Sequence, residues 1–266
     1  MSDAAVPRRF EQINALSVAE ATVGDPGNPT VVMLHGWGAN IDLVWPLALQ
    51  LARMGYQVFA PDLPGFGQTD PPPRAWRVND YVEFILAYLN FHQLQQVHLF
   101  GHSFGASLGL VLGAQHANRI RTMVLADASG LREQASGLTN KRLQTYKAVR
   151  DGLKRVGLNS LSDSLRTAYN ARYGSADFQA ATGVMRDTFV QVVNEDLRGY
   201  AGRVAVPTLL LWGDRDEDTP LSDARLLEKL IPDAGLVIYE GAGHYSYLER
   251  TAEAARAMQA LFISVD

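Results

Sequence analysis

An α/β fold with a mostly parallel central sheet is the structure that this sequence predicts. Short apolar runs that suit buried strands alternate with helical patterns four times in the first half of the chain, and the alternation resumes after residue 204. The runs at 30–34 and 56–60 are continuously apolar, as expected for strands covered on both faces of a parallel sheet. With 266 residues, 47% of them hydrophobic, the chain can form one large core with an insertion.

The predicted elements follow in chain order. Residues 8–23 suit a pair of edge strands, and an amphipathic helix is expected at 80–91, with Asn79 or Asp80 as its cap. Because the reactive side chains of such a fold gather at the carboxyl ends of the strands, the loops after the strands hold the candidates. The remaining strands are predicted at 30–34, 56–60, 97–100, 120–126, 208–212 and 235–239, and the remaining core helices at 43–54, 106–115, 222–230 and 251–263.

Residues 131–203 interrupt the alternation. Apolar residues recur there at helical spacing, so we expect a helical insertion in a core made of residues 1–130 and 204–266. The insertion has twelve Lys and Arg against seven Asp and Glu, a net charge of +5 that leaves −9 on the rest of the chain. Such an excess of Lys and Arg usually reflects basic helix faces that are exposed to solvent. The alternative is a basic lid that docks on an acidic core or attracts anionic substrates.

Composition sets further limits. The formal net charge of −4 gives no general reason to expect nucleic acid or an anionic membrane as a partner, and the lack of Cys excludes disulfides and thiol nucleophiles. The first nine residues do not form a secretory signal, and no apolar run reaches the roughly 18 residues that a membrane span needs. We therefore expect a cytoplasmic protein, monomeric or weakly oligomeric, that acts on a small molecule.

The turn Gly-His-Ser-Phe-Gly at 101–105 lies between a predicted strand and a predicted helix. This order is typical of a nucleophile elbow, in which glycines leave room for a strained serine with an exposed Oγ. The overlapping motif at 105–109 offers Ser107 instead. Ser107 follows a helical segment, so its hydroxyl is expected to bond to a carbonyl one turn earlier. Ser103 is therefore the predicted nucleophile.

A serine hydroxyl needs a base within hydrogen-bond reach. His244 is the predicted base, because it lies in a glycine-rich loop after the last strand. The acid that orients the imidazole is expected between the serine and the histidine in the chain, and Asp216 fits that position. Asp214, Glu217 and Asp218 compete with Asp216. Asp214 is so close to its strand that a bond to loop amides is its expected role.

Three further positions complete the predicted site. Asp127, at the end of the strand over 120–126, is another candidate acid, for which we expect a structural role at the hinge of the insertion. The developing oxyanion needs backbone N–H donors, and the predicted ones are Phe104, at a helix N-terminus, and Trp37, in the His-Gly-Trp-Gly loop. For the Trp37 side chain, packing against its neighbours and contact with the substrate are equally expected roles.

The other histidines are expected to be structural. His35 is predicted to be a hydrogen-bonding spacer and His102 a neighbour of the elbow, whereas His92, His98 and His116 are expected at surface or satisfied positions. No cluster has the spacing of a metal site, and no G-x-G-x-x-G motif follows a strand. We infer neither a cofactor nor a metal.

Five motifs together resemble the α/β-hydrolase superfamily over nearly the whole chain outside the insertion. The resemblance implies that Ser103, Asp216 and His244 form a triad and that the insertion is a helical cap. Ser103 makes the chain unlike haloalkane dehalogenases and epoxide hydrolases, which carry Asp there, and Ala106 departs from the glycine of many relatives. The motifs are His-Gly-Trp-Gly at 35–38, Asp-Leu-Pro-Gly-Phe-Gly at 62–67, Gly-His-Ser-Phe-Gly at 101–105, Trp-Gly-Asp-Arg-Asp at 212–216 and Gly-His at 243–244.

Within the superfamily, the chain is similar to bacterial carboxylesterases, including pimeloyl-carrier-protein methyl ester esterases. The expected reaction is hydrolysis of a carboxylic ester through an acyl-enzyme. Carbon–carbon bond hydrolases of ring-cleavage diketones share the same outline and are the first alternative. A ligand-binding module with a vestigial site is the alternative from another class. We expect residues 131–203 to determine which acyl group is accepted. The sequence alone does not show where their side chains lie.

Overall fold

A computed structural model of the chain describes residues 5–131, 137–155, 157–162 and 176–265. An eight-stranded sheet forms its centre, in the order β1-β2-β4-β3-β5-β6-β7-β8. β2 runs antiparallel to both of its neighbours, β1 and β4, and all other neighbouring strands are parallel. The predicted α/β class is therefore confirmed. The strands are β1 (Arg9–Ile13), β2 (Leu16–Val23), β3 (Thr30–Leu34), β4 (Gln57–Pro61), β5 (Val97–His102), β6 (Ile120–Ala126), β7 (Thr208–Gly213) and β8 (Ala234–Tyr239).

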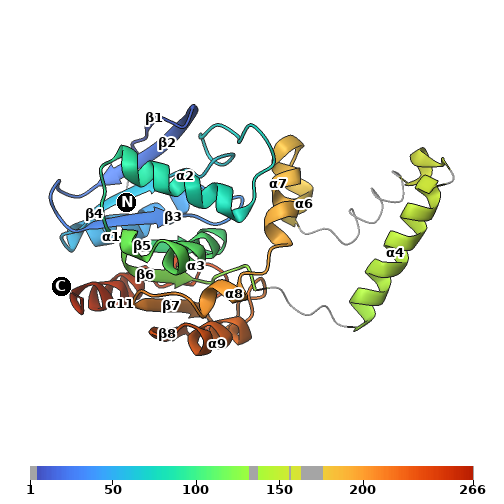
Figure 1. The fold of residues 1–266 in the computed structure, drawn as a ribbon. Coiled ribbons are helices and arrows are strands. Elements are labelled where there is room, and N and C mark those ends of the chain that lie inside the picture. The colour runs from blue at the N-terminus through green and yellow to red at the C-terminus, as the bar shows by residue number, and fades with distance from the viewer. Residues whose placement is uncertain (1–4, 132–136, 156, 163–175, 266) are drawn as a thin grey trace.

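Helices cover both faces of the sheet (Figure 1). α2, α3 and α9 share one apolar core with the sheet, and α1, α10 and α11 share the other. The core helices are α1 (Ile41–Arg53), α2 (Val78–Phe91), α3 (Phe104–Gln115), α9 (Leu221–Leu230), α10 (Ser246–Glu249) and α11 (Thr251–Ile263), with a 3₁₀ turn at Ala117–Arg119.

The parallel strands bury side chains on both faces. In β3, Val32 and Leu34 belong to the core with α2 and α3, whereas Val31 and Met33 belong to the core with α1 and α11. All four are fully buried. Alternate residues of a strand point to opposite faces, so a strand that is covered twice reads as one continuous apolar run.

The cap of α2 differs from the prediction. The helix begins at Val78 with Arg77 as its N-cap, so the prediction of Asn79 or Asp80 is wrong. Asp80 is the third residue of the helix, and its carboxylate accepts a hydrogen bond from the Arg77 N–H at 2.7 Å. An acidic residue in the first turn thus stabilises the N-terminus of the helix by accepting a hydrogen bond from the backbone of the N-cap residue.

In the segment predicted as a cap, α6 and α7 lie beside the carboxyl ends of the strands, whereas α4 stands apart from the sheet (Figure 1). α7 packs on the core, because the rings of Phe189 and Trp37 are 5.1 Å apart and the Thr188 hydroxyl accepts from the Trp76 N–H at 3.1 Å. Residues 132–136, 156 and 163–175 of the predicted cap lie outside the described residues, and the boundaries at 131 and 203 stay predictions. The helices are α4 (Gly137–Arg155), α6 (Ala176–Ala180), α7 (Gly183–Val193) and α8 (Arg198–Ala201).

Within the described ranges, no helix is long and apolar enough to cross a membrane.

The order of the strands determines where a ligand can bind. The chain passes from β3 to β4 on one side and then to β5 on the other side of β3. The loops after β3 and β5 therefore diverge, which is the switch point where open α/β sheets bind ligands. The loop at 35–38 follows β3, and Ser103 follows β5.

A buried carboxylate ties the antiparallel edge of the sheet to α2. Glu20 on β2 is fully buried, contacts Arg9 on β1 and lies 2.8 Å from Nε2 of His92 at the end of α2. Burial raises the pKa of Glu20, but the hydrogen bonds with His92 and Arg9 outweigh it, so the pKa lies below the ordinary 4.5. The charged form stabilises the fold above that value, and this contribution is lost as the pH falls through the lowered pKa.

Replacing Glu20 with Gln is expected to lower the free energy of unfolding by about 1.5–3 kcal/mol at neutral pH, the range for a lost hydrogen bond to a charged group. Urea unfolding at about pH 7 and about pH 3 measures the change, and the difference from wild type should shrink at the lower pH. The control is Glu11→Gln, because the partly exposed carboxylate of Glu11 lies 3.7 Å from the same Arg9. This variant should lower the free energy of unfolding by less than about 1 kcal/mol. Equal effects of the two variants would contradict the assignment.

Candidate active site

Ser103 occupies the sharp turn between β5 and α3. Its φ of 49° and ψ of −108° are strained for a residue with a side chain. Backbone hydrogen bonds hold the turn: the Ser103 N–H donates to the Ala126 carbonyl at 2.9 Å, and the Ser103 carbonyl accepts from the N–H groups of Ser107 and Ser129 at 3.1 Å and 3.3 Å. The predicted strand, turn and helix are therefore present at this position.

Glycines let the elbow pack tightly. A Cβ on Gly101 would lie 2.4 Å from the carbonyl oxygen of Gly105, and a Cβ on Gly105 would lie 2.3 Å from that of Leu34. Any larger residue would push α3 away from β3 and β5. The two glycines of the motif are needed for this close backbone approach.

Asp216 and His244 form a hydrogen-bonded pair. Nδ1 of His244 lies 2.9 Å from Oδ2 of Asp216. The same Oδ2 accepts from the Thr219 hydroxyl at 2.6 Å, and Oδ1 accepts from the N–H groups of Asp218 and Thr219 at 2.8 Å and 2.9 Å. Burial raises the pKa of Asp216, but these hydrogen bonds outweigh it and lower the pKa. The charged carboxylate keeps the His244 proton on Nδ1, which leaves Nε2 free to accept one.

The charge of Asp216 also acts on His244. Burial lowers the pKa of the imidazole, but the hydrogen bond to Asp216 and its negative charge outweigh burial and raise the pKa above the ordinary 6.5. Ser103 and His244 line the same cavity. The structure thus brings together the serine, histidine and aspartate that the sequence singled out.

Asp214 and Asp218, which compete with Asp216 in the sequence, have different contacts from Asp216. Oδ1 of Asp214 accepts from the Gly241 N–H at 2.7 Å, so its predicted bond to a loop amide is confirmed. Asp218 is exposed and lines the cavity. Neither carboxylate is hydrogen-bonded to His244 among the contacts of the described residues, whereas Asp216 is.

Asp127 connects the loops that carry Asp216 and His244. Its Oδ1 accepts from the Gly213 N–H at 3.0 Å, and its Oδ2 accepts from the N–H and the hydroxyl of Ser246 at 3.1 Å and 2.7 Å. Burial, against these bonds, raises the pKa of Asp127 to about 7. These contacts make Asp127 structural, but they join the end of β7 to the start of α10, whereas the sequence predicted a role at the hinge of the insertion. No motif in the sequence points to partners 86 and 119 positions away.

His102 contacts the His244 loop, a role that its sequence position does not predict. Its buried ring donates from Nε2 to the backbone carbonyl of His244 at 2.7 Å, and it packs on the rings of His244 and Tyr245. Burial, with the nearby His244, lowers the pKa of His102 to about 3. A neutral His102 therefore fixes the backbone of the His244 loop without adding a charge.

The loop after β3 passes beside the serine. Nε2 of His35 accepts from the Leu63 N–H at 2.9 Å, and Nδ1 donates to the Gly36 carbonyl at 2.8 Å, which confirms the predicted spacer. Burial lowers the pKa of His35 and so favours this neutral form. A Cβ on Gly36 would lie 3.3 Å from Cβ of Ser103. The loop is therefore close enough for its N–H groups to face the reacting carbonyl.

The two predicted oxyanion donors are Trp37, in this loop, and Phe104, at the start of α3. Among the described residues, no acceptor is bonded to the N–H of Trp37, and that of Phe104 lies at the first position of α3, where no intrahelical acceptor exists. The Trp37 ring packs against Phe104 and Phe189 and also lines the cavity. Both roles considered for this side chain are thus compatible with its position.

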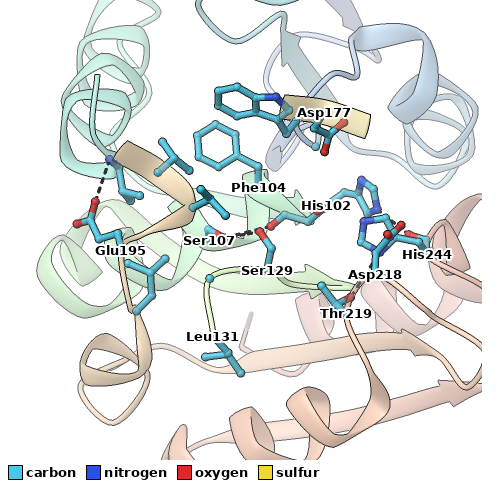
Figure 2. A pocket seen from close by; sticks show the side chains of 18 of the residues that line it. His102, Phe104, Ser107, Ser129, Leu131, Asp177, Glu195, Asp218, Thr219 and His244 are labelled. Atoms are coloured by element: carbon cyan, nitrogen blue, oxygen red, sulfur yellow. Dashed lines mark hydrogen bonds between the residues drawn. The ribbon is translucent and has the colours of Figure 1, made fainter. Parts of the chain in front are cut away.

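Ser103 opens into a cavity of about 450 Å³ between the core and the helices α6 and α7 (Figure 2). Its wall combines apolar and polar side chains, and three carboxylates reach it, those of Asp177, Glu195 and Asp218. The described part of the wall has no Lys or Arg. Asp177 and Glu195 belong to the segment with the net charge of +5, so the local charge is opposite to the one that the composition suggested. The apolar lining includes Trp37, Val78, Phe104, Leu131, Phe189, Val192, Val193 and Leu197.

One group of described residues has the spacing of metal ligands. Potential ligand atoms of Asp216, Asp218 and His244 lie within 4.8 Å of one another. Both oxygens of Asp216 and Nδ1 of His244 are already hydrogen-bonded, to each other and to the loop. The arrangement fits a charge-assisted hydrogen bond better than a set of ligands.

NMR titration of the imidazole signals tests this electrostatic arrangement. In the wild type, the pKa of His244 is expected above 6.5, and Asp216→Asn should lower it because the charge that stabilises the imidazolium is lost. Asp218→Asn is the matched control, with a smaller expected effect because Asp218 does not bond to the ring. A His244 pKa that is unchanged in Asp216→Asn would contradict the pairing.

Comparisons with known proteins agree with this geometry. A family model described as alpha/beta hydrolase fold matches residues 29–251. Lipase 1 of Psychrobacter immobilis is 25% identical over 255 residues, which cover 87% of this chain and 76% of the relative. The pimeloyl-(acyl-carrier protein) methyl ester esterase of Chromobacterium violaceum is 27% identical over 252 residues, which cover 86% of this chain and 92% of the relative.

The fold is also similar to solved structures. One of them is the 2-hydroxy-6-oxo-6-phenylhexa-2,4-dienoate hydrolase of Rhodococcus sp. strain RHA1, with a TM-score of 0.70 and 22% identity over 97% of this chain and 99% of that one. The family model covers most of the chain, including the elbow and the segments that carry Asp216 and His244. The chain therefore belongs to the α/β-hydrolase fold family.

Proposed function

We propose that this protein is a serine hydrolase that cleaves carboxylic esters. The observation that carries the proposal is the hydrogen-bonded pair of Asp216 and His244 on the cavity into which the strained elbow presents Ser103. A nucleophile, a base and an acid in these positions suit acyl transfer. The lipase and the methyl ester esterase among the relatives act on esters by their names, which supports the same chemistry here.

The mechanism follows from the protonation states. Oγ of Ser103 attacks the ester carbonyl while Nε2 of His244 takes the hydroxyl proton, and Asp216 stabilises the imidazolium that forms. The N–H groups of Trp37 and Phe104 hold the oxyanion. His244 then passes its proton to the leaving alcohol, and an acyl-enzyme on Ser103 remains. A water molecule, activated by His244, releases the acid and restores the serine.

The first alternative is a carbon–carbon bond hydrolase, as represented by the Rhodococcus structure. The substrate in that protein's name is a dienoate, which carries a carboxylate. The carboxylates of Asp177, Glu195 and Asp218 in the cavity wall would repel such a substrate. This charge favours a neutral ester. A ligand-binding module with a vestigial site is the second alternative, and covalent labelling of Ser103 would count against it.

Three further proposals concern the molecule in the cell. We infer a cytoplasmic protein that is monomeric or a weak homo-oligomer and that acts on a small molecule. Light scattering of the purified chain tests the oligomeric state.

The Ser103→Ala variant is expected to lower kcat/KM for a neutral ester by at least ~10³-fold, because no other group can form the acyl-enzyme. Hydrolysis of short p-nitrophenyl esters measures the loss, and circular dichroism checks that the variant is folded. A fluorophosphonate should label the wild type and Ser107→Ala, but not Ser103→Ala. Folded wild-type protein without label, or label on Ser107, would overturn the proposal.

A matched pair of esters tests the charge of the cavity. Methyl hexanoate and monomethyl adipate have similar lengths, but the second carries a carboxylate. We expect kcat/KM to be about tenfold higher for methyl hexanoate at low ionic strength, and added salt should narrow the gap.

The variant Asp177→Asn/Asp218→Asn should also narrow this gap. Faster turnover of monomethyl adipate than of methyl hexanoate would instead favour attraction of anions by the basic segment. Turnover of a ring-cleavage dienoate at a kcat/KM similar to that for the neutral ester would support the carbon–carbon hydrolase.

A further inference from the structure

Two serine hydroxyls meet in the wall of the cavity beside Ser103 (Figure 2). Ser107 lies on α3 and Ser129 lies in the loop after β6, and their Oγ atoms are 2.9 Å apart. Oγ of Ser107 is also 3.4 Å from the Ser103 carbonyl oxygen, one helical turn earlier, in agreement with the predicted bond. We call Ser107 and Ser129 the serine pair.

The serine pair shares the cavity wall with apolar side chains. Phe104, Leu131, Val192 and Leu197 line the same cavity. The space beside the pair depends on Gly130, which has a φ of 94°; a Cβ there would lie 3.0 Å from Oγ of Ser107 and 2.7 Å from Cδ1 of Leu197. Hydroxyl groups beside apolar side chains can fix the orientation of a ligand, because they offer a hydrogen bond at one defined place.

The position of His244 tells which half of an ester meets the serine pair. His244 must give its proton to the leaving alcohol, so the alcohol lies on the side of His244 and Asp218. In Figure 2, the serine pair and Leu131 lie away from His244 and Asp218. The acyl chain on Ser103 therefore extends toward the serine pair.

A count of donors and acceptors indicates what the serine pair can bind. Each hydroxyl has one proton and two acceptor positions. If Ser107 donates to the Ser103 carbonyl, then Ser129 donates to Ser107 and keeps free acceptor positions. If Ser107 donates to Ser129, then Ser129 keeps a free proton. A ligand hydroxyl suits both arrangements, because it can donate and accept, whereas a ketone or a carboxylate only accepts.

We propose that the serine pair recognises a hydroxyl group on the acyl chain, so that the substrates are esters of hydroxylated carboxylic acids. The proposal rests on the proposed esterase function. It adds a specificity determinant to that function, since the same mechanism acts on esters with or without the hydroxyl.

The test compares three esters by pH-stat: methyl hexanoate, methyl 3-hydroxyhexanoate and methyl 6-hydroxyhexanoate. For the wild type, kcat/KM of one hydroxy ester should exceed that of methyl hexanoate by about three- to tenfold, as expected for one added hydrogen bond. The ratio of the two values should fall to about one in Ser107→Ala/Ser129→Ala. Val192→Ala is the matched control, because it removes an apolar contact from the same wall and should leave that ratio as in the wild type.

The outcomes separate this inference from the function on which it rests. If the wild type cleaves methyl hexanoate and Ser103 is labelled, but the hydroxy esters gain nothing, the serine pair is no recognition site. An equal ratio in the wild type and in the double variant would overturn the inference in the same way. If no ester is cleaved and Ser103 is not labelled, the esterase function itself fails.

Discussion

The backbone turn at Ser103 is the constraint on which the rest of the site depends. The chain must leave β5 and enter α3 within a single residue, which requires a positive φ at a serine. This conformation persists because the turn is over-determined: its N–H is bonded to β6, and Gly101 and Gly105 bring α3 against the backbone of β3 and β5. The same packing points the N-terminus of α3 toward the place where negative charge would develop.

Around this turn, buried polar groups hold the other loops in place. Asp127 bonds to the loops after β7 and β8, and His102 bonds to the backbone of His244. Burial favours the neutral imidazole of His102. Asp216 is hydrogen-bonded to the His244 ring, and the negative charges of Asp127 and Asp218 also act on it. The bonds from Asp127 and His102 hold the loop that carries His244 and so maintain the orientation of its ring. The charge of Asp216 raises the pKa of that ring.

Most of the fold could be predicted because the parallel strands are buried on both faces and leave continuous apolar runs. Asp216 could be chosen over Asp214 from its distance to the end of β7, and the structure gives Asp214 the amide bond expected of it. The roles of Asp127 and His102 could not be read from the sequence, since their partners are far along the chain. Net charge was also a poor guide, because a basic segment can place its few carboxylates at the cavity.

The direct test of an acyl-enzyme on Ser103 is intact-protein mass spectrometry after acid quenching of the reaction with p-nitrophenyl hexanoate. If the acyl-enzyme forms, a hexanoyl adduct should appear together with a burst of p-nitrophenol. The adduct should map to the peptide that contains Ser103. The adduct should persist longer in His244→Gln, because deacylation also needs the base. Turnover of the ester by the wild type with no adduct at any quench time in either protein, or an adduct on another residue, would contradict the mechanism.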